Sequence, residues 1–324
     1  MLQPFQSGSG KLPGIIVGLV LLVFFLAAAV KTPAAEPVTV ILDAHGNRIE
    51  VKKPFTRIIS LYSAHTENIC SFGAAELLVG ISTSDDYPEE ILDRTRFSYR
   101  EDPEKFIAYT PDLVLVRPMI ERSYPQFLEK LRRSGITVIS LQPNSVSEMF
   151  DYWRTLGVLT GKVQAANDMI TDFQNRLQHI KDSVLAIDDT DRPLVYFESI
   201  HTKSKTFAPE SIGAYVLEQA GGRNVASDAV QVRKTNIAYF GKEQLLSNGE
   251  EVDFFLAQVG RMNPVSVDTI TSEPGFDAIK AVREKKVYLI EEQLVSRPTL
   301  RIITGIEKLH NLFFNTTARE PGLL

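Results

Sequence analysis

The chain has 324 residues, of which 44% are hydrophobic and 23% are charged, and its formal net charge is −5. This length suffices for about two domains and a sizeable core, and the acidic balance disfavours a nucleic-acid partner because phosphate binding needs a basic face. The single cysteine, Cys70, cannot form an internal disulfide, and the five histidines show no zinc-binding spacing.

The N-terminal segment contains an uncharged, almost wholly apolar run at residues 14–30, between Lys11 and Lys31. Such a run, followed by small residues, is typical of a secretory signal peptide, and its length also lies at the bottom of the range for a membrane span. We therefore expect residues 1–35 to be a signal peptide or, alternatively, an uncleaved membrane anchor. In both cases the rest of the chain is expected in the periplasm or another extracytoplasmic space. No cysteine follows the run closely, so a lipid anchor through an N-terminal cysteine is not expected.

Short apolar segments alternate with helical patterns in residues 36–144. Residues 38–42 and 48–51 flank a glycine turn, which predicts a hairpin. Further strands are predicted at residues 57–61, 78–81, 113–116 and 137–141, with helices at 62–73, 104–109 and 124–133. This alternation predicts an N-terminal lobe with a parallel α/β sheet.

Two connecting helices are predicted at residues 145–159 and 163–187, on either side of Gly161. The second helix carries apolar residues at spacings of three and four: Val163, Ala166, Ile170, Phe173, Leu177, Ile180, Val184 and Ile187. This period places them on one helical face. Because α/β patterns stand on both sides, the stripe favours a strut joining two lobes, and such a strut implies a cleft. The alternative is a coiled-coil seam.

The α/β alternation resumes in residues 188–314. Strands are predicted at residues 194–198, 254–258 and 287–290, and helices at 212–220, 241–246, 276–282 and 300–314. Residues 315–324 are expected to form a tail. The prediction is thus an α/β protein of two Rossmann-like lobes, each with a central, largely parallel sheet, joined by one long backbone helix.

Several segments carry a family resemblance. They are RIISLYSAHTENICSFGAAELLVGIS at residues 57–82, DPEKFIAYTPDLVLV at 102–116, PESIGAYVLEQAGGRNVASD at 209–228 and RPTLRIITGIEKL at 297–309. Over residues 38–314 the chain resembles the periplasmic substrate-binding proteins of ABC importers for iron complexes and cobalamin. The resemblance implies a monomer that holds its ligand between two lobes. It also implies delivery of the ligand to a permease dimer with a cytoplasmic ATPase, without catalysis.

The loops that follow the strands are the candidate ligand-binding positions, because open α/β sheets bind ligands beyond the carboxyl ends of their strands. Tyr62 and His65 open a helix whose N-terminus would favour an anion. A structural role is the alternative for His65, and direct metal binding is another. The expected ligand-binding residues are Tyr62, His65, Tyr87, Tyr99, Arg100, Arg117, Phe207, Tyr239, Arg297 and Arg301.

Arginines and aromatic residues in this set suggest the ligand's chemistry. Arginine holds carboxylates and catecholates by bidentate contacts, and the arginines of both lobes, with Arg122 and Arg233, favour an anionic, oxygen-rich ligand. Phe207, Tyr239 and Phe240 would supply apolar walls, and core packing is the alternative for them.

Two glutamates are expected to contact the permease. The resemblance implies a glutamate on the outer surface of each lobe that docks onto permease arginines, and PESIG places Glu210 at the second-lobe position. In the first lobe, Glu121 lies in a comparable loop beside Arg122. A glutamate in a first helical turn is also stabilised by the helix dipole, which is the alternative role for Glu210.

A ferric siderophore is the favoured ligand, and haem or a corrinoid is the alternative. A cobalamin binder of this family carries a pocket tryptophan near the position of Ser98, and its absence here weakens a cobalamin assignment. The only tryptophan, Trp153, lies on a connecting helix, where core packing is expected. An enzyme is disfavoured because the chain has no GxSxG, HExxH or Walker motif, so no catalytic residue or catalytic cofactor is expected. A membrane-tethered sensor or scavenger is a further alternative.

Overall fold

The computed structural model describes residues 39–233, 235–315 and 320–324, so the apolar run at residues 14–30 lies outside it. Within these ranges, no helix has both the length and the apolar character needed to cross a membrane. The described chain begins with the predicted hairpin, formed by the antiparallel strands β1 (Thr39–Leu42) and β2 (Arg48–Val51). Asp43 closes the turn by accepting hydrogen bonds from the backbone N–H groups of His45 and Asn47, over 2.8 and 2.9 Å.

The first sheet has five parallel strands in the order β5-β4-β3-β6-β7. Its strands are β3 (Ile58–Ser60), β4 (Leu78–Ser82), β5 (Arg96–Phe97), β6 (Leu113–Val116) and β7 (Thr137–Ser140). Its helices are α1 (Ser63–Ser71), α2 (Pro103–Ala108), α3 (Pro118–Ser123) and α4 (Pro125–Arg133). All four residues of β6 are apolar and buried, as expected for a parallel strand that is covered on both faces. The predicted parallel sheet is confirmed, and β5 and α3 are additions to it.

The second sheet has eight strands in the order β11-β12-β9-β8-β13-β14-β15, with β10 also paired to β8. They are β8 (Leu194–Ile200), β9 (Lys205–Phe207), β10 (Arg223–Asn224), β11 (Val230–Gln231), β12 (Ile237–Tyr239), β13 (Phe254–Val259), β14 (Val287–Glu291) and β15 (Gly322–Leu323). The predicted strands β8, β13 and β14 pair in parallel, whereas β9, β12 and β11 extend the sheet antiparallel. The segment expected to be a tail contributes β15, which pairs with β14.

Helices of the second lobe flank this sheet. They are α7 (Ile212–Gln219), α8 (Lys242–Ser247), α9 (Val267–Thr271), α10 (Lys280–Arg283), α11 (Glu292–Val295) and α12 (Ile302–Phe314). The helix predicted at residues 276–282 is divided, because Ile279 has an extended backbone (φ −85°, ψ 124°) that separates a short 3-10 turn from α10.

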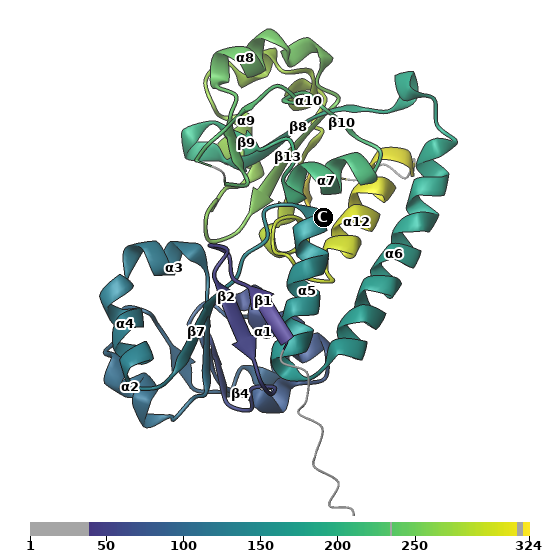
Figure 1. Ribbon diagram of the computed structural model, residues 1–324. Helices are drawn as coiled ribbons and strands as arrows, with labels where there is room; N and C mark the ends of the chain where they lie inside the picture. Colours follow the sequence, from purple (N-terminus) through teal and green to yellow (C-terminus); the bar gives the residue numbers. More distant parts are fainter. Residues whose placement is uncertain (1–38, 234, 316–319) are drawn as a thin grey trace, which may run out of the picture. The chain divides into compact units, whose positions relative to one another are not determined.

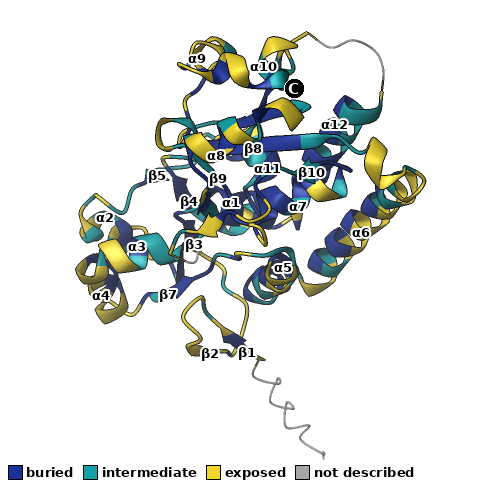
Figure 2. Cartoon of the chain, turned by 90° about the horizontal axis from the view of Figure 1, so that it is seen from above, coloured by how far each residue is buried: buried dark blue, intermediate teal, exposed yellow. Residues whose placement is uncertain are grey.

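The connecting helices are α5 (Val146–Thr160) and α6 (Val163–Leu185), shown in Figure 1. Gly161 ends α5 in the left-handed conformation (φ 70°), which glycine adopts without strain. Helix α6 packs on α5 and on the second-lobe helices α7 and α12. Figure 2 shows α6 with one buried and one exposed side.

The apolar stripe of α6 is buried through its centre, at Ala166, Ile170, Phe173, Leu177 and Ile180, and the neighbouring Met169 is buried with it. Its first residue, Val163, is 47% exposed. The buried residues belong to one hydrophobic core with Ile58 and Leu113 of the first sheet and Val195 and Leu256 of the second. The stripe therefore packs against both lobes within one chain, as the strut hypothesis predicts, and a coiled-coil seam is not needed to cover it.

Candidate functional site

The two lobes meet at the carbonyl group of Pro298, which lies between α11 and α12. Asn68 of α1 donates a hydrogen bond from Nδ2 to this oxygen over 2.9 Å, and Nε1 of Trp153 on α5 donates to it over 3.0 Å. Trp153 is fully buried, which confirms its expected place in the core. The segment with Arg297 and Arg301 is thereby held against α1, the helix that follows the carboxyl end of β3.

Ion pairs cross this junction. Nε and Nη2 of Arg301 each lie 2.7 Å from a carboxylate oxygen of Glu67 on α1. Nη1 of Arg297 lies 2.9 Å from Oδ1 of Asp86 and 3.6 Å from Oε2 of Glu67. Glu67 is only 2% exposed, so arginine charges balance its carboxylate inside the protein. Burial raises the pKa of Asp86, but the hydrogen bond and charge of Arg297 outweigh it and hold this pKa below its ordinary value.

Two arginine–tyrosine contacts lie beside these pairs. The guanidinium carbon of Arg117 is 5.1 Å from the centre of the Tyr62 ring, and that of Arg301 is 4.3 Å from the centre of the Tyr87 ring. Such cation–π contacts orient a guanidinium group while leaving its N–H donors available. Burial raises the pKa of Tyr62, while the nearby positive charges of Arg117 and Arg297 act to lower it.

Five of the expected ligand-binding residues are therefore brought together from both lobes. We call this group, with its two acidic partners, the interlobe cluster: Tyr62, Glu67, Asp86, Tyr87, Arg117, Arg297 and Arg301. Its first-lobe members follow the carboxyl ends of β3, β4 and β6, where an open α/β sheet binds ligands.

A carboxyl group of the protein itself occupies the first turn of α1. Asp85 is 4% exposed, and its Oδ2 accepts hydrogen bonds from Oγ1 of Thr66 over 2.7 Å and from the backbone N–H of Ser82 over 3.0 Å. Burial raises the pKa of Asp85, although the hydrogen bonds from Thr66 and Ser63 act to lower it. Asp85 therefore lies beside the helix end where the sequence predicted an anionic ligand, and anion binding there stays a prediction.

The structure places His65 behind Tyr62 in the protein interior, not on a binding surface. It is fully buried, with Nδ1 2.7 Å from the Tyr152 hydroxyl and Nε2 3.0 Å from the Val116 carbonyl oxygen. A carbonyl only accepts, so Nε2 donates to Val116 and Nδ1 accepts from Tyr152. Burial lowers the pKa of His65 to about 4. Both nitrogens are engaged, which corrects the expectation that His65 contacts the ligand or a metal.

In the described part of the chain, no group of three or more His, Cys, Asp and Glu side chains is arranged to hold a metal ion.

The other expected ligand residues have different neighbours. Phe207 is 1% exposed, and its ring centre lies 4.7 Å from that of Phe197, so Phe207 is a core residue and its expected role as a pocket wall is corrected. Tyr239 is half exposed, with Nζ of Lys205 4.3 Å from its ring centre. Ligand contact by Tyr239 stays a prediction.

Tyr99 and Arg100 lie beside α4. The Tyr99 ring centre is 4.8 Å from that of Tyr124, and the Arg100 guanidinium is 5.6 Å from the Tyr99 ring. Among the described residues, no hydrogen bond, ion pair or ring contact joins Tyr99 or Arg100 to the interlobe cluster, so their ligand contact also stays a prediction. Arg122 and Arg233 are exposed.

The two expected docking glutamates differ in their surroundings. Glu121 is engaged within its own lobe, with Oε1 3.1 Å from Arg132 and Oε2 2.9 Å from His45. This pairing competes with an arginine of another protein, and permease contact by Glu121 stays a prediction. Glu210 is exposed and lies directly before Ser211, the N-cap residue of α7.

Some residues of the site were missed at the sequence level. Glu67 and Asn68 lie within an apolar helical pattern, and a charged or amide side chain buried there must have a partner. A similar signal marks Glu198 at the end of β8, which is 1% exposed and has both carboxylate oxygens 3.1 Å from Nδ1 of His201. The sequence shows the polar residue in each case, but not its partner.

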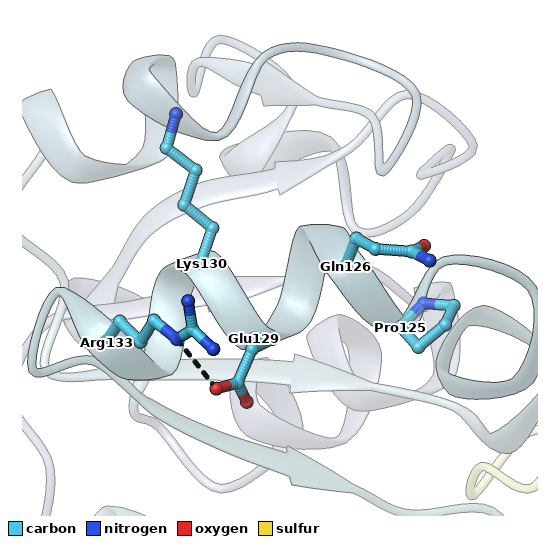
Figure 3. Close-up of a pocket in the computed structure, with 5 residues that line it drawn as sticks. All are labelled: Pro125, Gln126, Glu129, Lys130 and Arg133. Atoms are coloured by element: carbon cyan, nitrogen blue, oxygen red, sulfur yellow. Dashed lines mark hydrogen bonds and ion pairs between the residues drawn. The ribbon is translucent and has the colours of Figure 1, made fainter.

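Two surface hollows lie away from the cluster. One of about 440 Å³ is lined by Pro125, Gln126, Glu129, Lys130 and Arg133, and Figure 3 shows that all five project from α4. Its charged groups are paired, since Nε of Arg133 lies 2.9 Å from Oε1 of Glu129 and Nζ of Lys130 lies 2.8 Å from Oε1 of Glu104. A second hollow, of about 290 Å³, lies where the β1–β2 hairpin approaches α5. Neither brings together groups from both lobes.

The structure has two sheets joined by α6, and polar groups converge between them. A comparison with known protein families agrees with this architecture. A family model described as periplasmic binding protein matches residues 58–294. The chain belongs to this periplasmic binding protein family.

Curated relatives of this periplasmic binding protein are bacterial. An uncharacterized ABC transporter substrate-binding lipoprotein, YvrC of Bacillus subtilis (strain 168), is 25% identical over 295 residues, which cover 88% of each chain. The vitamin B12-binding protein of Vibrio cholerae serotype O1 is 26% identical over 262 residues, covering 79% of this chain and 89% of the relative.

A solved structure shares the fold. The crystal structure of a Staphylococcus epidermidis protein, described as a possible iron-binding (periplasmic solute-binding) protein, superimposes with a TM-score of 0.69 at 25% identity. The match covers 81% of this chain and all of the other. The predicted α/β architecture of two lobes is thereby confirmed.

Proposed function

We propose that this periplasmic binding protein captures a metal chelate at the interlobe cluster and delivers it to the permease of an ABC importer, without chemical turnover. The observation that carries the proposal is the convergence of rings and guanidinium groups from both lobes at the strand ends. Ligands of open α/β sheets bind at such strand ends, and aromatic rings with a few convergent polar groups are typical of small-molecule sites.

The ligand classes that we propose are a ferric siderophore or, as alternatives, haem or a corrinoid. The names of the relatives support this range, since one relative binds vitamin B12 and another is described as iron-binding. In each class the metal enters with the ligand. The protein therefore needs no resident metal site of its own.

A binding titration tests the proposal. The purified protein is titrated by calorimetry with a ferric hydroxamate, a ferric catecholate, haem and cobinamide. The intrinsic fluorescence of Trp153 provides a second signal, because this single tryptophan hydrogen-bonds at the junction of the lobes. We expect at least one probe to bind below the micromolar range and to be recovered unchanged. Absence of such binding for all four probes would refute the proposed function.

We further propose that Glu210 contacts the permease. Glu210 is exposed and stands in the PESIG segment on which the family resemblance rests. Reversing its charge with Glu210→Lys should reduce transport and leave ligand affinity unchanged. Glu243 provides a matched control, since it is an exposed glutamate in the first turn of α8. Lost ligand affinity in Glu210→Lys would place Glu210 in the binding site instead.

The N-terminal segment is proposed to direct the chain out of the cytoplasm, either as a cleaved signal or as a retained anchor. N-terminal sequencing of the mature protein distinguishes these cases, since a start near residue 30 or 36 removes the anchor. Lipid attachment is not part of the proposal, because Cys70 lies inside α1. We also propose a monomer, since the apolar face of α6 is covered within the chain.

A further inference from the structure

The charges of the interlobe cluster are largely paired within the chain. Arg301 binds Glu67 through its Nε and Nη2 groups, and Arg297 is shared between Asp86 and Glu67. Two of the three cluster arginines therefore already have carboxylate partners. The expectation from the sequence that the arginines favour an anionic, oxygen-rich ligand loses support from these two, because their charge is balanced before any ligand arrives.

Other acidic groups add to this balance. Asp85 lies beside the first turn of α1, where its Oδ2 accepts a hydrogen bond from Oγ1 of Thr66. Glu292, at the start of α11, is near enough to Tyr62 for its negative charge to act on the phenol. The surroundings of Tyr62 thus carry about as many acidic as basic groups.

Arg117 differs from the other two cluster arginines. Among the residues that the structure describes, it has no carboxylate within ion-pair distance, and its guanidinium lies over the ring of Tyr62. It stands directly after β6, at the strand end where ligands bind. The ring orients the guanidinium without using its donors, which leaves them available for an acidic group of a ligand.

We propose that the interlobe cluster selects a metal chelate of low net charge, and that Arg117 binds the single acidic group of such a ligand. This inference rests on the proposed function and specifies the ligand that it takes. A trianionic chelate would either face Asp86 and Glu292 or pull Arg301 away from Glu67. The second course would leave a carboxylate that is 2% exposed without its bidentate partner, which is unfavourable.

Four probes that differ in charge test this inference. They are a neutral ferric trihydroxamate, a trianionic ferric triscatecholate, cyanocobalamin and dicyanocobinamide, of which the last lacks the nucleotide phosphodiester. We expect the tightest of the low-charge probes to bind at least roughly tenfold more tightly than the trianion at low salt. Tightest binding of the trianion would overturn the inference and leave the proposed function standing. Absence of binding by all four probes would overturn the inference, and absence of haem binding as well would overturn the proposed function.

An Asp86→Asn variant tests the charge balance by a gain of binding. Asp86 is more than half exposed, so the substitution should not prevent folding. Freeing Arg297 should raise the affinity for the trianion roughly tenfold relative to the wild type, with little change for the neutral trihydroxamate. An unchanged trianion affinity would show that pairing with Asp86 does not control the ligand's charge.

An Arg117→Met variant tests the anchor. It should weaken cyanocobalamin roughly tenfold to a hundredfold, as expected for loss of a hydrogen bond to a charged group, and should leave dicyanocobinamide unchanged. Arg122→Met is the matched control, since Arg122 is exposed on α3. An equal loss for both corrinoids, or no loss for either, would contradict the role assigned to Arg117.

Discussion

Replacing Arg301 by methionine should destabilise the folded protein, because it leaves the buried carboxylate of Glu67 without its bidentate partner. Removing one member of a buried ion pair costs about 3–5 kcal/mol. Nη1 of Arg297 remains 3.6 Å from Glu67 and offsets part of that loss. We therefore expect the lower end of the range, about 3 kcal/mol.

The assay is urea unfolding followed by circular dichroism, which yields the free energy of unfolding for each variant. The double variant Glu67→Gln/Arg301→Met removes both charges and should recover most of the stability, since apolar or neutral replacements of a buried pair are often near neutral. Arg122→Met, at an exposed site, should change the free energy of unfolding by less than about 0.5 kcal/mol. A cost below about 1 kcal/mol for Arg301→Met, or a double variant less stable than the single one, would refute the reasoning.

Three further predictions concern the core and the connecting helices. Burial lowers the pKa of His65 to about 4, so the unfolded chain binds more protons below pH 6.5. His65 should therefore lower the free energy of unfolding by up to about 3 kcal/mol as the pH falls from 6.5 to 4. Urea titrations at each pH measure this free energy, and the His65→Gln variant should lack the part of the decrease that His65 causes. Phe173→Ala should lower the free energy of unfolding by about 3–5 kcal/mol, since Phe173 is fully buried in the α6 stripe; a cost near that of an exposed site would contradict its place in the shared core. Gly161→Ala should lower the melting temperature, because an alanine there would adopt φ 70° and its Cβ would lie 2.9 Å from Cγ of Pro54; equal melting temperatures would show that the turn relaxes freely.

Periodicity and motif order account for the parts of the fold that the sequence predicted. Long apolar or strictly periodic segments such as β6 and the centre of α6 match their predicted positions closely, because burial on both faces or on one helical face leaves a clear pattern. The two-residue strands β10, β11 and β15 were not predicted. Segments so short cannot display a period, and their pairing depends on neighbours that are distant in the chain.

For the candidate site, too, some features were predicted from the sequence and others were not. Residue type and position after a strand were sufficient to select Tyr62, Tyr87 and Arg117. They were not sufficient to separate these from Phe207, because an aromatic residue near a strand end serves equally well in a core. Only packing distinguishes the two cases, through the close approach of Phe197 to Phe207 and of Arg117 to Tyr62.

The sequence by itself determined the α/β class, the two lobes, the connecting helix and the family resemblance, since each depends on local periodicity or on motifs in order. Only the tertiary structure decided which charges meet. Glu67 and Arg301 are separated by 234 positions in the chain yet form a bidentate ion pair. Both ring nitrogens of His65 form hydrogen bonds inside the protein, with Tyr152 and Val116. Coulomb interactions and hydrogen bonds depend on distance in space, so the pairing of charges between the lobes became apparent only once the chain was folded.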